Sequence, residues 1–477
     1  MKKSKLLTML VVLAVIGIFF SSFLPKIINQ SFITGNNDKT PVYGDDVNLE
    51  LSKVSGRIHI NNNWSAAEAL GICTGSGTYS EPYLIEYLEI DGQISETCIL
   101  IENSNQYFRI ENCTCDNVYI GIKLNNVTRG SLLENTIGYT QSEEGCDGIY
   151  FTDSHNITVS GNNIYQCEEG IDLNDSNNNT VSGNLMAGID YAGIKLTNCD
   201  NSTISANIAH SSSLGGSIRL FYSNNIKISG NKLEFITNHF VTNSQIINNK
   251  AITISTTDSD NNKIVGNTVG ENTWAKGIIL RKSTNTIVSG NTVNSNSNHG
   301  IYLDDYSINN AISGNDVYNN GYHGIFLEDN CNNNTITGNN VHSNIQHGIY
   351  LLNSHYNNVS GNTANSQYFG DGIFLTTSHN NTISNNTANS NKYGIHLHTS
   401  NNNTVSGNSL MGNQKCIVEE NCQGNEFNYN GDCQYPPQDP PKKEPTLPGY
   451  NLLLLITILT TLLGIIIIII IKKQKIE

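Results

Sequence analysis

The chain has 477 residues, a formal net charge of −15 and only 14% charged residues. It is rich in Asn, Gly and Ser and has few Ala, Leu or Glu residues, which disfavours a helical protein. Ile and Val recur along most of the length, which also disfavours disorder. Because an acidic protein repels the phosphate backbone, we expect no nucleic-acid partner.

The N-terminus has the pattern of an export signal. A lysine-rich start precedes an uncharged apolar run, Leu6–Leu24, and this order is typical of a secretory signal. We therefore predict a signal peptide or signal anchor over residues 1–30. Residues 31–82 are expected to form a lead-in and a cap, which would shield the first strand edge of the domain that follows.

The middle of the chain is built from one repeat. The pattern Gly-Ile-x-Leu, a polar Asn/Ser stretch, a β-branched residue and Ser-Gly-Asn recurs about every 23 residues, for example at Gly300, Gly324 and Gly348. Short alternating stretches between turn residues indicate strands. A unit this short cannot bury its own apolar face, so the units must stack. We predict an all-β, single-stranded parallel β-helix of about 14 coils over residues 83–432.

A column of Asn residues supports this solenoid. One Asn recurs at the same place in successive repeats, after the β-branched residue. In register, each amide can bond to the next amide along the rod, and Asn tolerates the left-handed backbone of a corner. The predicted ladder consists of Asn162, Asn184, Asn207, Asn231, Asn267, Asn291, Asn315, Asn339, Asn362, Asn386 and Asn408.

These repeats resemble the right-handed parallel β-helix repeats of NosD-like proteins and of carbohydrate-binding and sugar-hydrolase (CASH) modules. The resemblance covers residues 83–432 and implies a right-handed coil. The group contains lyases, hydrolases, epimerases and binding modules, so the resemblance does not choose among activities. NosD-like proteins are described as copper-associated, which implies copper as one possible cofactor.

An aromatic column lies on the outside of the predicted rod. In Gly-Ile-x-Leu the Ile and Leu side chains point inward, so x and the residue after Leu point outward. The x positions between residues 277 and 398 include Tyr302, Phe326, Tyr350 and Phe374. Exposed rings one coil apart would form an apolar strip for stacking sugar rings. The alternative is that these rings only pack on a pleated surface.

The residues after Leu supply carboxylates. Asp304 and Glu328 are neighbours one coil apart, and glycoside hydrolysis uses a pair of carboxylates as acid and base or nucleophile. The alternative is a salt-bridge ladder in which Arg281 neutralises them. Asp305 with Asp329 would add a calcium site, because stacked carboxylates repel one another unless a cation intervenes.

A third column lies immediately before each Gly. It contains His299, His323 and His347, and neutral imidazoles in register are suitable copper ligands. The alternative is a corner residue that recurs because the whole unit was duplicated. Both interpretations stay open, since the sequence does not show whether this corner points outward.

The C-terminal end has the features of a membrane anchor. Residues 433–450 hold most of the nine prolines and predict a stiff spacer. Residues 451–471 are apolar and long enough to span a bilayer, and the positive-inside rule places the basic tail 472–477 in the cytoplasm. Pro448-Gly449-Tyr450, the apolar span and the basic tail together resemble the sorting signals of archaeal surface proteins. We therefore expect the body outside the cell.

An exported body favours disulfides and glycans. The chain has 11 Cys, and Cys416, Cys422 and Cys433 cluster where a disulfide would close the last coil. Asn-x-Ser/Thr sequons recur, for example at Asn156 and Asn201. They predict a glycoprotein with modified turns.

One preferred function and two alternatives follow. The preferred function is a membrane-anchored cell-surface module that binds a polysaccharide or a surface glycoprotein, or has a structural or adhesive role. The first alternative is a polysaccharide hydrolase or lyase that uses the outward face of residues 277–398. The second is a NosD-like copper-associated protein. Motifs for serine hydrolases and phosphate-binding loops are absent from the sequence, which favours a non-catalytic module.

Overall fold

The computed structural model describes residues 53–138, 147–211, 217–271, 275–431 and 433. The predicted signal segment, membrane span and basic tail lie outside these residues. Within the described part of the chain, no helix is long and apolar enough to cross a membrane. The membrane anchor therefore stays a prediction.

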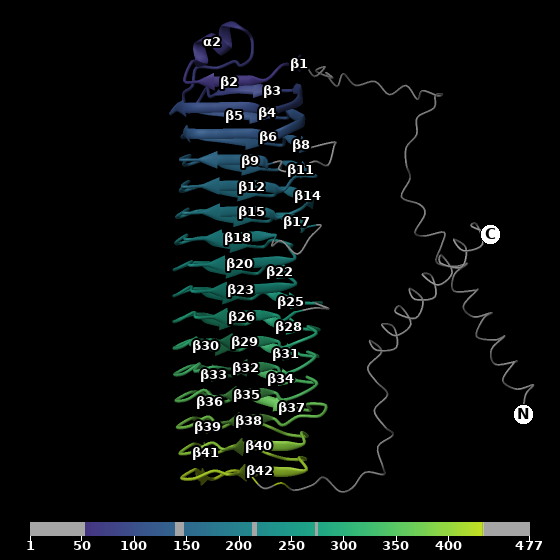
Figure 1. Cartoon of the computed structure of the whole chain (residues 1–477), viewed down its shortest axis with the longest axis vertical. Helices are drawn as coiled ribbons and strands as arrows, with labels where there is room; N and C mark the ends of the chain where they lie inside the picture. The colour runs from purple at the N-terminus through teal and green to yellow at the C-terminus, as the bar shows by residue number, and fades with distance from the viewer. Residues whose placement is uncertain (1–52, 139–146, 212–216, 272–274, 432, 434–477) are drawn as a thin grey trace, which may run out of the picture. The chain divides into compact units, whose positions relative to one another are not determined.

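The described residues form a parallel β-helix. Each coil contributes short strands, and each strand pairs in parallel with its equivalents in the neighbouring coils (Figure 1). Pairing begins ahead of residue 83, because β1 and β2 both pair with β4. The predicted all-β solenoid of about 14 coils is thereby confirmed.

Sheet A contains 21 strands and carries the candidate site. Its strands are β1 (Lys53–Ser55), β2 (Ile58–Asn61), β4 (Leu88–Ser104), β6 (Thr114–Val127), β8 (Thr136–Gly138), β9 (Asp147–Thr152), β11 (Asn163–Tyr165), β12 (Glu169–Asn174), β14 (Leu185–Ile189), β15 (Ala192–Thr197), β17 (Ile208–Ser211), β18 (Ile218–Phe221), β20 (Phe235–His239), β23 (Thr253–Thr257), β26 (Ile278–Arg281), β29 (Ile301–Asp304), β32 (Ile325–Leu327), β35 (Ile349–Leu352), β38 (Ile373–Thr376), β40 (Tyr393–His398) and β42 (Lys415–Glu420).

Two further sheets complete the coils. Sheet B contains 16 strands and a third sheet contains 6. The strands of sheet B are β3 (Tyr83–Glu86), β5 (Phe108–Glu111), β7 (Gly130–Leu133), β10 (Thr158–Ser160), β13 (Thr180–Ser182), β16 (Thr203–Ser205), β19 (Lys227–Ser229), β21 (Gln245–Ile247), β24 (Lys263–Val265), β27 (Ile287–Ser289), β30 (Ala311–Ser313), β33 (Thr335–Thr337), β36 (Asn358–Ser360), β39 (Thr382–Ser384), β41 (Thr404–Ser406) and β43 (Glu426–Asn428). The strands of the third sheet are β22 (Lys250–Ala251), β25 (Thr268–Gly270), β28 (Thr292–Asn294), β31 (Asp316–Tyr318), β34 (Asn340–His342) and β37 (Thr363–Asn365).

Inward apolar side chains fill the rod and explain the repeat. Ile301 and Leu303 are fully buried and lie in register on their equivalents in β32. Burying each such side chain stabilises the fold by about 1.5–3 kcal/mol. The glycine before them is required by close approach, because a Cβ on Gly300 would lie 2.5 Å from a Val317 methyl and 2.7 Å from the Gly324 carbonyl oxygen.

The predicted Asn ladder is present inside the rod. Its members are at most 2% exposed. The Asn339 Nδ2 donates to Oδ1 of Asn362 and to the carbonyl oxygen of Ile312, each at 2.9 Å. The Asn339 Oδ1 in turn accepts from the backbone N–H and the Nδ2 of Asn315, at 3.0 and 2.9 Å. Each amide therefore forms hydrogen bonds to buried groups of the coils before and after its own. Buried polar groups need such partners.

A short cap covers the first coil. Helix α2 (Trp64–Ala69) places Trp64, which is 2% exposed, over the end of the core. The indole stacks on Tyr83 with centroids 4.8 Å apart, and its N–H donates to Ser104 Oγ at 2.8 Å. The apolar end of the rod is shielded at this terminus.

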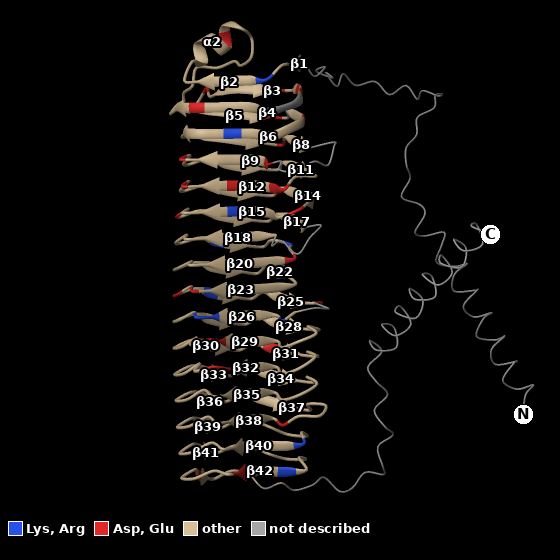
Figure 2. Cartoon of the chain, viewed as in Figure 1, with Lys and Arg blue, Asp and Glu red and all other residues tan. Residues whose placement is uncertain are grey.

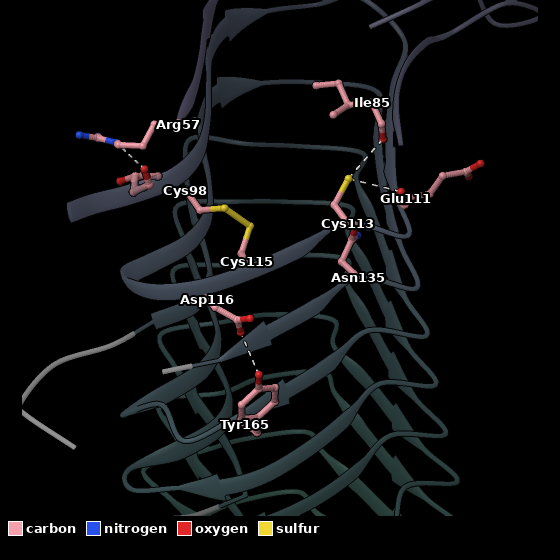
Figure 3. Close-up of a disulfide and its surroundings, with 10 residues drawn as sticks. Arg57, Ile85, Cys98, Glu111, Cys113, Cys115, Asp116, Asn135 and Tyr165 are labelled. Atoms are coloured by element: carbon pink, nitrogen blue, oxygen red, sulfur yellow. Dashed lines mark hydrogen bonds between the residues drawn. A yellow bond between two sulfur atoms is a disulfide. The ribbon is translucent and has the colours of Figure 1, made fainter. Parts of the chain in front are cut away.

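Two disulfides hold the ends of the solenoid. Cys98 and Cys115 join β4 to β6 near the N-terminal end (Figure 3). Cys416 and Cys433 close the last coil, as the cysteine cluster predicts. Cys422, the third member of that cluster, is a free thiol.

The ladder gives a matched test of stability. Replacing Asn339 by Ala leaves the buried backbone N–H and amide N–H of Asn315 without their acceptor and removes a donor to the Ile312 carbonyl. We expect a loss of about 2–4 kcal/mol in the free energy of unfolding, measured by chemical denaturation. Asn340, the next residue, is exposed and makes one side-chain hydrogen bond, to Asp316. Asn340→Ala is therefore expected to change stability by less than about 0.5 kcal/mol, and equal losses would contradict the ladder's role.

Candidate functional site

Two outward columns lie side by side on sheet A between β26 and β40. One column is the residue before each Gly, and the other is the x residue of Gly-Ile-x-Leu. Ring centroids of the two columns are 5.4 Å apart for His299 and Tyr302 and 5.0 Å apart for His323 and Phe326. We call this surface the aromatic wall. It consists of His299, Tyr302, His323, Phe326, His347, Tyr350, Phe374 and His396.

The x column is more covered than the sequence suggests. Tyr302 and Phe326 are only 4% and 5% exposed, whereas Tyr350 and Phe374 are partly exposed. The rings stack on one another along the rod, with Phe326 and Tyr350 4.8 Å apart and 8° from parallel. Their faces are thus occupied, and the His column covers their sides. The expected exposure is wrong for Tyr302 and Phe326, while a role in glycan binding stays a prediction.

The His column is a hydrogen-bonded ladder. Backbone N–H groups donate to the imidazole Nδ1 one coil away, from His323 to His299 at 3.3 Å and from His347 to His323 at 3.2 Å. The next N–H, of Asp371, donates to His347 Nδ1 at 2.9 Å. The rings stack with centroids 5.0 and 5.1 Å apart. The imidazoles at this corner therefore accept backbone N–H groups of the neighbouring coil, as the Asn amides do inside the rod.

The ladder keeps these histidines neutral. Burial lowers the pKa of His299 to about 3, with the charge of Lys276 adding to the shift. Burial and the flanking imidazoles lower the pKa of His323 to about 2. Burial lowers the pKa of His347 to about 4, although Asp371 opposes the shift. Since Nδ1 accepts a hydrogen bond, the proton of each neutral ring lies on Nε2.

The two predicted catalytic carboxylates are already engaged by the protein. Arg281 donates from Nε and Nη2 to the same Asp304 oxygen, at 3.0 and 2.8 Å. The Tyr302 hydroxyl donates to Glu328 Oε2 at 2.7 Å, and burial together with this bond raises the Tyr302 pKa. The Arg281–Asp304 pair is the salt bridge that the sequence offered as the alternative. One oxygen of each carboxylate is therefore engaged by a neighbouring side chain.

Lys276 closes the N-terminal end of the aromatic wall. Its Nζ lies 3.3 Å from the centroid of the Tyr302 ring, a cation–π contact. Burial lowers the Lys276 pKa, and the charges of Asp304 and Glu328 oppose that shift. The amine is thus held over the wall by a ring face and nearby carboxylates.

An Asp–His pair that the sequence did not single out closes the other end. The His396 Nδ1 lies 3.0 Å from Asp371 Oδ2, and Asp371 is 2% exposed. The His396 ring stacks on Phe374 at 4.5 Å. Its Nε2 has no hydrogen-bond partner among the described residues, and Glu420 Oε2 lies 3.8 Å away. Asp371 continues the column before each Gly, and His396 continues the x column. Their place in the repeat is the sequence signal that could have identified them.

Exposed aromatic residues lie on the turns beside the wall. Tyr322 is 46% exposed, and its ring meets that of His299 edge-on, at 5.6 Å and 65°. Tyr368 and Phe369 are 44% and 74% exposed. We call these three residues the rim. They stand in turns of variable sequence, where no repeat period indicates them.

The same face is charged in the N-terminal half. Lys195 bonds to Glu169 at 2.9 Å and to Asp172 at 3.2 Å, and Figure 2 shows these charges on β12 and β15. Burial, together with these two carboxylates, raises the pKa of Asp147 to about 7. The neutral aromatic wall is therefore confined to the C-terminal half of the face.

The comparisons with known families agree with this geometry. The family model "Right handed beta helix region" matches residues 97–237 and 236–364. The chain belongs to the right-handed β-helix family. A second family model, "Periplasmic copper-binding protein (NosD)", matches residues 305–436. No curated protein matches the chain.

Solved β-helix proteins show only a distant likeness. The periplasmic alginate epimerase AlgG is 15% identical, with 72% of this chain and 84% of that chain covered and a TM-score of 0.32. The A-module of the Azotobacter vinelandii mannuronan C-5 epimerase AlgE6 is 15% identical, with 80% of this chain and 95% of that chain covered and a TM-score of 0.26. The Dettilon tailspike protein is 18% identical, with 67% of this chain and 62% of that chain covered and a TM-score of 0.36. Scores of this size do not bear on the activity of this β-helix protein.

The predicted metal ligands do not fit a metal centre. A copper ion needs an imidazole lone pair, but the Nδ1 lone pairs of the His column accept backbone N–H groups and the Nε2 atoms carry protons. Asp305, a predicted calcium ligand, lies 3.3 Å from Lys282 Nζ. Among the described residues, no group of three or more His, Cys, Asp or Glu side chains is placed to hold a metal ion.

The His column predicts a loss of stability in acid. The pKa of a histidine in the unfolded chain is about 6.5, above the folded pKa of all three histidines. As pH falls, the unfolded chain therefore binds more protons than the folded chain. Stability should therefore decrease between about pH 6.5 and pH 4, with each histidine contributing about 1.4 kcal/mol per pH unit. His323→Asn keeps an acceptor for the His347 N–H but removes the titrating ring. Denaturation at a series of pH values should show a slope smaller by one proton, and an unchanged slope would contradict this account.

Proposed function

We propose that this β-helix protein is a non-catalytic cell-surface module that binds a polysaccharide, or the glycan of a surface glycoprotein, at the aromatic wall and its rim. The observation that carries the proposal is the neutral wall, bordered by the exposed rings of Tyr322 and Phe369. Apolar ring surface with polar groups at both ends suits a sugar chain, which presents C–H faces and hydroxyl groups. Lys276 and the Asp371–His396 pair supply those polar ends.

The contacts favour binding over catalysis. A glycosidase needs one protonated acid and one carboxylate free to act as base or nucleophile. Asp304 is held by Arg281, and Glu328 accepts the Tyr302 hydroxyl. Stacked side chains on consecutive coils also form a rigid surface, which lowers the entropy lost on binding.

We further propose that the body lies outside the cytoplasm and is anchored through residues 451–471. The two disulfides agree with an oxidising compartment. The NosD family model, whose description is periplasmic, is compatible with an extracytoplasmic body. The proline-rich spacer and the basic tail 472–477 support an anchor that holds the rod off the membrane, processed as in archaeal surface proteins.

A paired substitution tests the binding face. In the full chain, Tyr322→Ala with Phe369→Ala removes rim rings that contribute little to the core. On a glycan array followed by titration, affinity should fall about tenfold or more. Tyr79→Ala, which removes an 83% exposed ring in the cap, should leave affinity unchanged.

Tyr350→Ala with Phe374→Ala should weaken binding further, because these rings are the exposed part of the wall. Incubation with the same glycans should produce no new reducing ends and no unsaturated products. Product formation that disappears in Asp304→Asn would overturn the non-catalytic proposal in favour of a hydrolase or lyase. Binding that survives both pairs would show that the glycan contacts another face.

Protease treatment of intact cells tests the location. The described body should be cleaved from the cells, whereas a basic-tail epitope beyond residue 471 should remain protected. Western blotting of both parts gives the result. A fully protected body would show that the topology is inverted.

A further inference from the structure

One corner of the rod, between sheet A and sheet B, carries an exposed Asn in successive coils. Each backbone N–H donates to a carbonyl of the next coil, for example from Asn178 to Asp200 at 2.9 Å. The φ angles are positive, 60° at Asn178 and 55° at Asn201, a conformation that Asn adopts readily. The column contains Asn156, Asn178, Asn201, Asn225, Asn243, Asn261, Asn285, Asn309, Asn333, Asn380 and Asn402, with Tyr356 in the remaining coil.

The repeat turns many of these residues into glycosylation sequons. After the corner Asn, the chain places one inward residue and then the first residue of a sheet B strand, as in Asn178, Asn179 and Thr180. When that strand begins with Thr, the corner reads Asn-x-Thr, the acceptor sequence for N-glycans. Such sequons begin at Asn156, Asn178, Asn201, Asn333, Asn380 and Asn402.

The corner amides are available, in contrast to the inner ladder. Asn178 is exposed, whereas Asn179, next to it, is 1% exposed and donates to the Ser154 carbonyl. Across the described residues, the amide nitrogens of Asn156, Asn178 and Asn201 donate no hydrogen bond. The sequon Asn thus projects from a convex corner with its reacting atom unengaged.

We propose that this corner is a row of N-glycan acceptors, the glycan comb. In the transfer, the Asn Nδ2 forms a bond to the anomeric carbon of a glycosyl phosphate donor. The bond between that carbon and the phosphate oxygen breaks, the phosphate carrier leaves with the electron pair, and Nδ2 releases one proton. This inference rests on the proposed extracytoplasmic body, where the chain would meet the donor, and it extends the predicted glycoprotein to defined positions.

The spacing of the coils limits how many acceptors are used. Neighbouring coils are about 4.8 Å apart, which is narrower than a branched glycan. Asn156, Asn178 and Asn201 lie on consecutive coils, so modification of Asn178 should hinder both neighbours. We therefore expect mutually exclusive occupancy along this run rather than full modification.

The comb is interrupted where the rod exposes another aromatic pair. The corner residues from Asn225 to Asn309 lack Thr or Ser two positions later. Tyr222 and Phe240 lie on the turns of Asn225 and Asn243, are 60% and 46% exposed, and stack with ring centroids 4.9 Å apart. Glycans at these coils would cover the two rings, and the interruption leaves them uncovered.

The comb and the aromatic wall occupy opposite edges of sheet A. In the coil of β29, His299 precedes the strand and Asn309 follows it beyond the next turn. Glycans on the comb therefore extend from the far side of the sheet. The proposed binding face stays open.

Glycopeptide mass spectrometry of the full chain, purified from its own membranes, tests the proposal. We expect glycans at comb positions, with Asn178 and Asn201 rarely modified on the same molecule. Thr203→Ala should abolish modification of Asn201 and increase that of Asn178, and Thr203→Ser should retain it. Both variants keep the Asn and the strand, so loss of folding does not explain the change.

The control is Asn358, an exposed sequon within strand β36 and flanked by β33 and β39. It should carry no glycan, and occupancy equal to that of the comb would show that the corner does not select acceptors. Vacant comb positions on a body that protease removes from intact cells would overturn the comb while the proposed location stands. Vacant positions on a protected body would overturn both.

Discussion

Register between coils is the constraint on which the rest of this protein depends. Because the strands pair in parallel, each side chain lies on its own equivalent about 4.8 Å away. A residue repeated in every coil is therefore stacked on copies of itself, and a repeated charge would repel its neighbours. Asn meets this constraint, since a neutral amide both donates and accepts along the rod. The inner ladder through Asn315, Asn339 and Asn362 follows directly.

The His column meets the same constraint with a different side chain. A neutral imidazole stacks on its equivalents and accepts one backbone N–H, as between His299 and His323. Protonation would place like charges about 5 Å apart in a buried column, so burial and register together hold the pKa values low. Stability is thereby coupled to pH, and the lone pairs that a metal would need are used by the backbone. The column is best understood as part of the scaffold that presents the wall.

Several charges on the outer face lie beside opposite charges. Lys195 lies between Glu169 and Asp172, and Arg281 pairs with Asp304 one coil away. These pairs offset the repulsion that stacking would otherwise cause, and they account for Asp304, one of the two carboxylates that resemble a catalytic pair. The neutral rings between Lys276 and Asp371 leave a different kind of surface, apolar along its length and polar at its ends. This contrast is the physical basis for assigning binding to the C-terminal half.

The repeat, its parallel stacking, the inner Asn ladder and the disulfide near the last coil could all be predicted from the sequence. Each depends on spacing along the chain, and spacing becomes register once the units stack. The exposure of Tyr302 and Phe326 could not, because it depends on the neighbouring His column and on turns that follow no period. The rim residues Tyr322 and Phe369 were missed for the same reason. Sequons are abundant in any Asn-rich chain, and only the folded register shows which of them share one corner. Local periodicity determined the scaffold of this protein, whereas contacts between columns, which exist only after the coils stack, decided which side chains are covered and which remain free to bind.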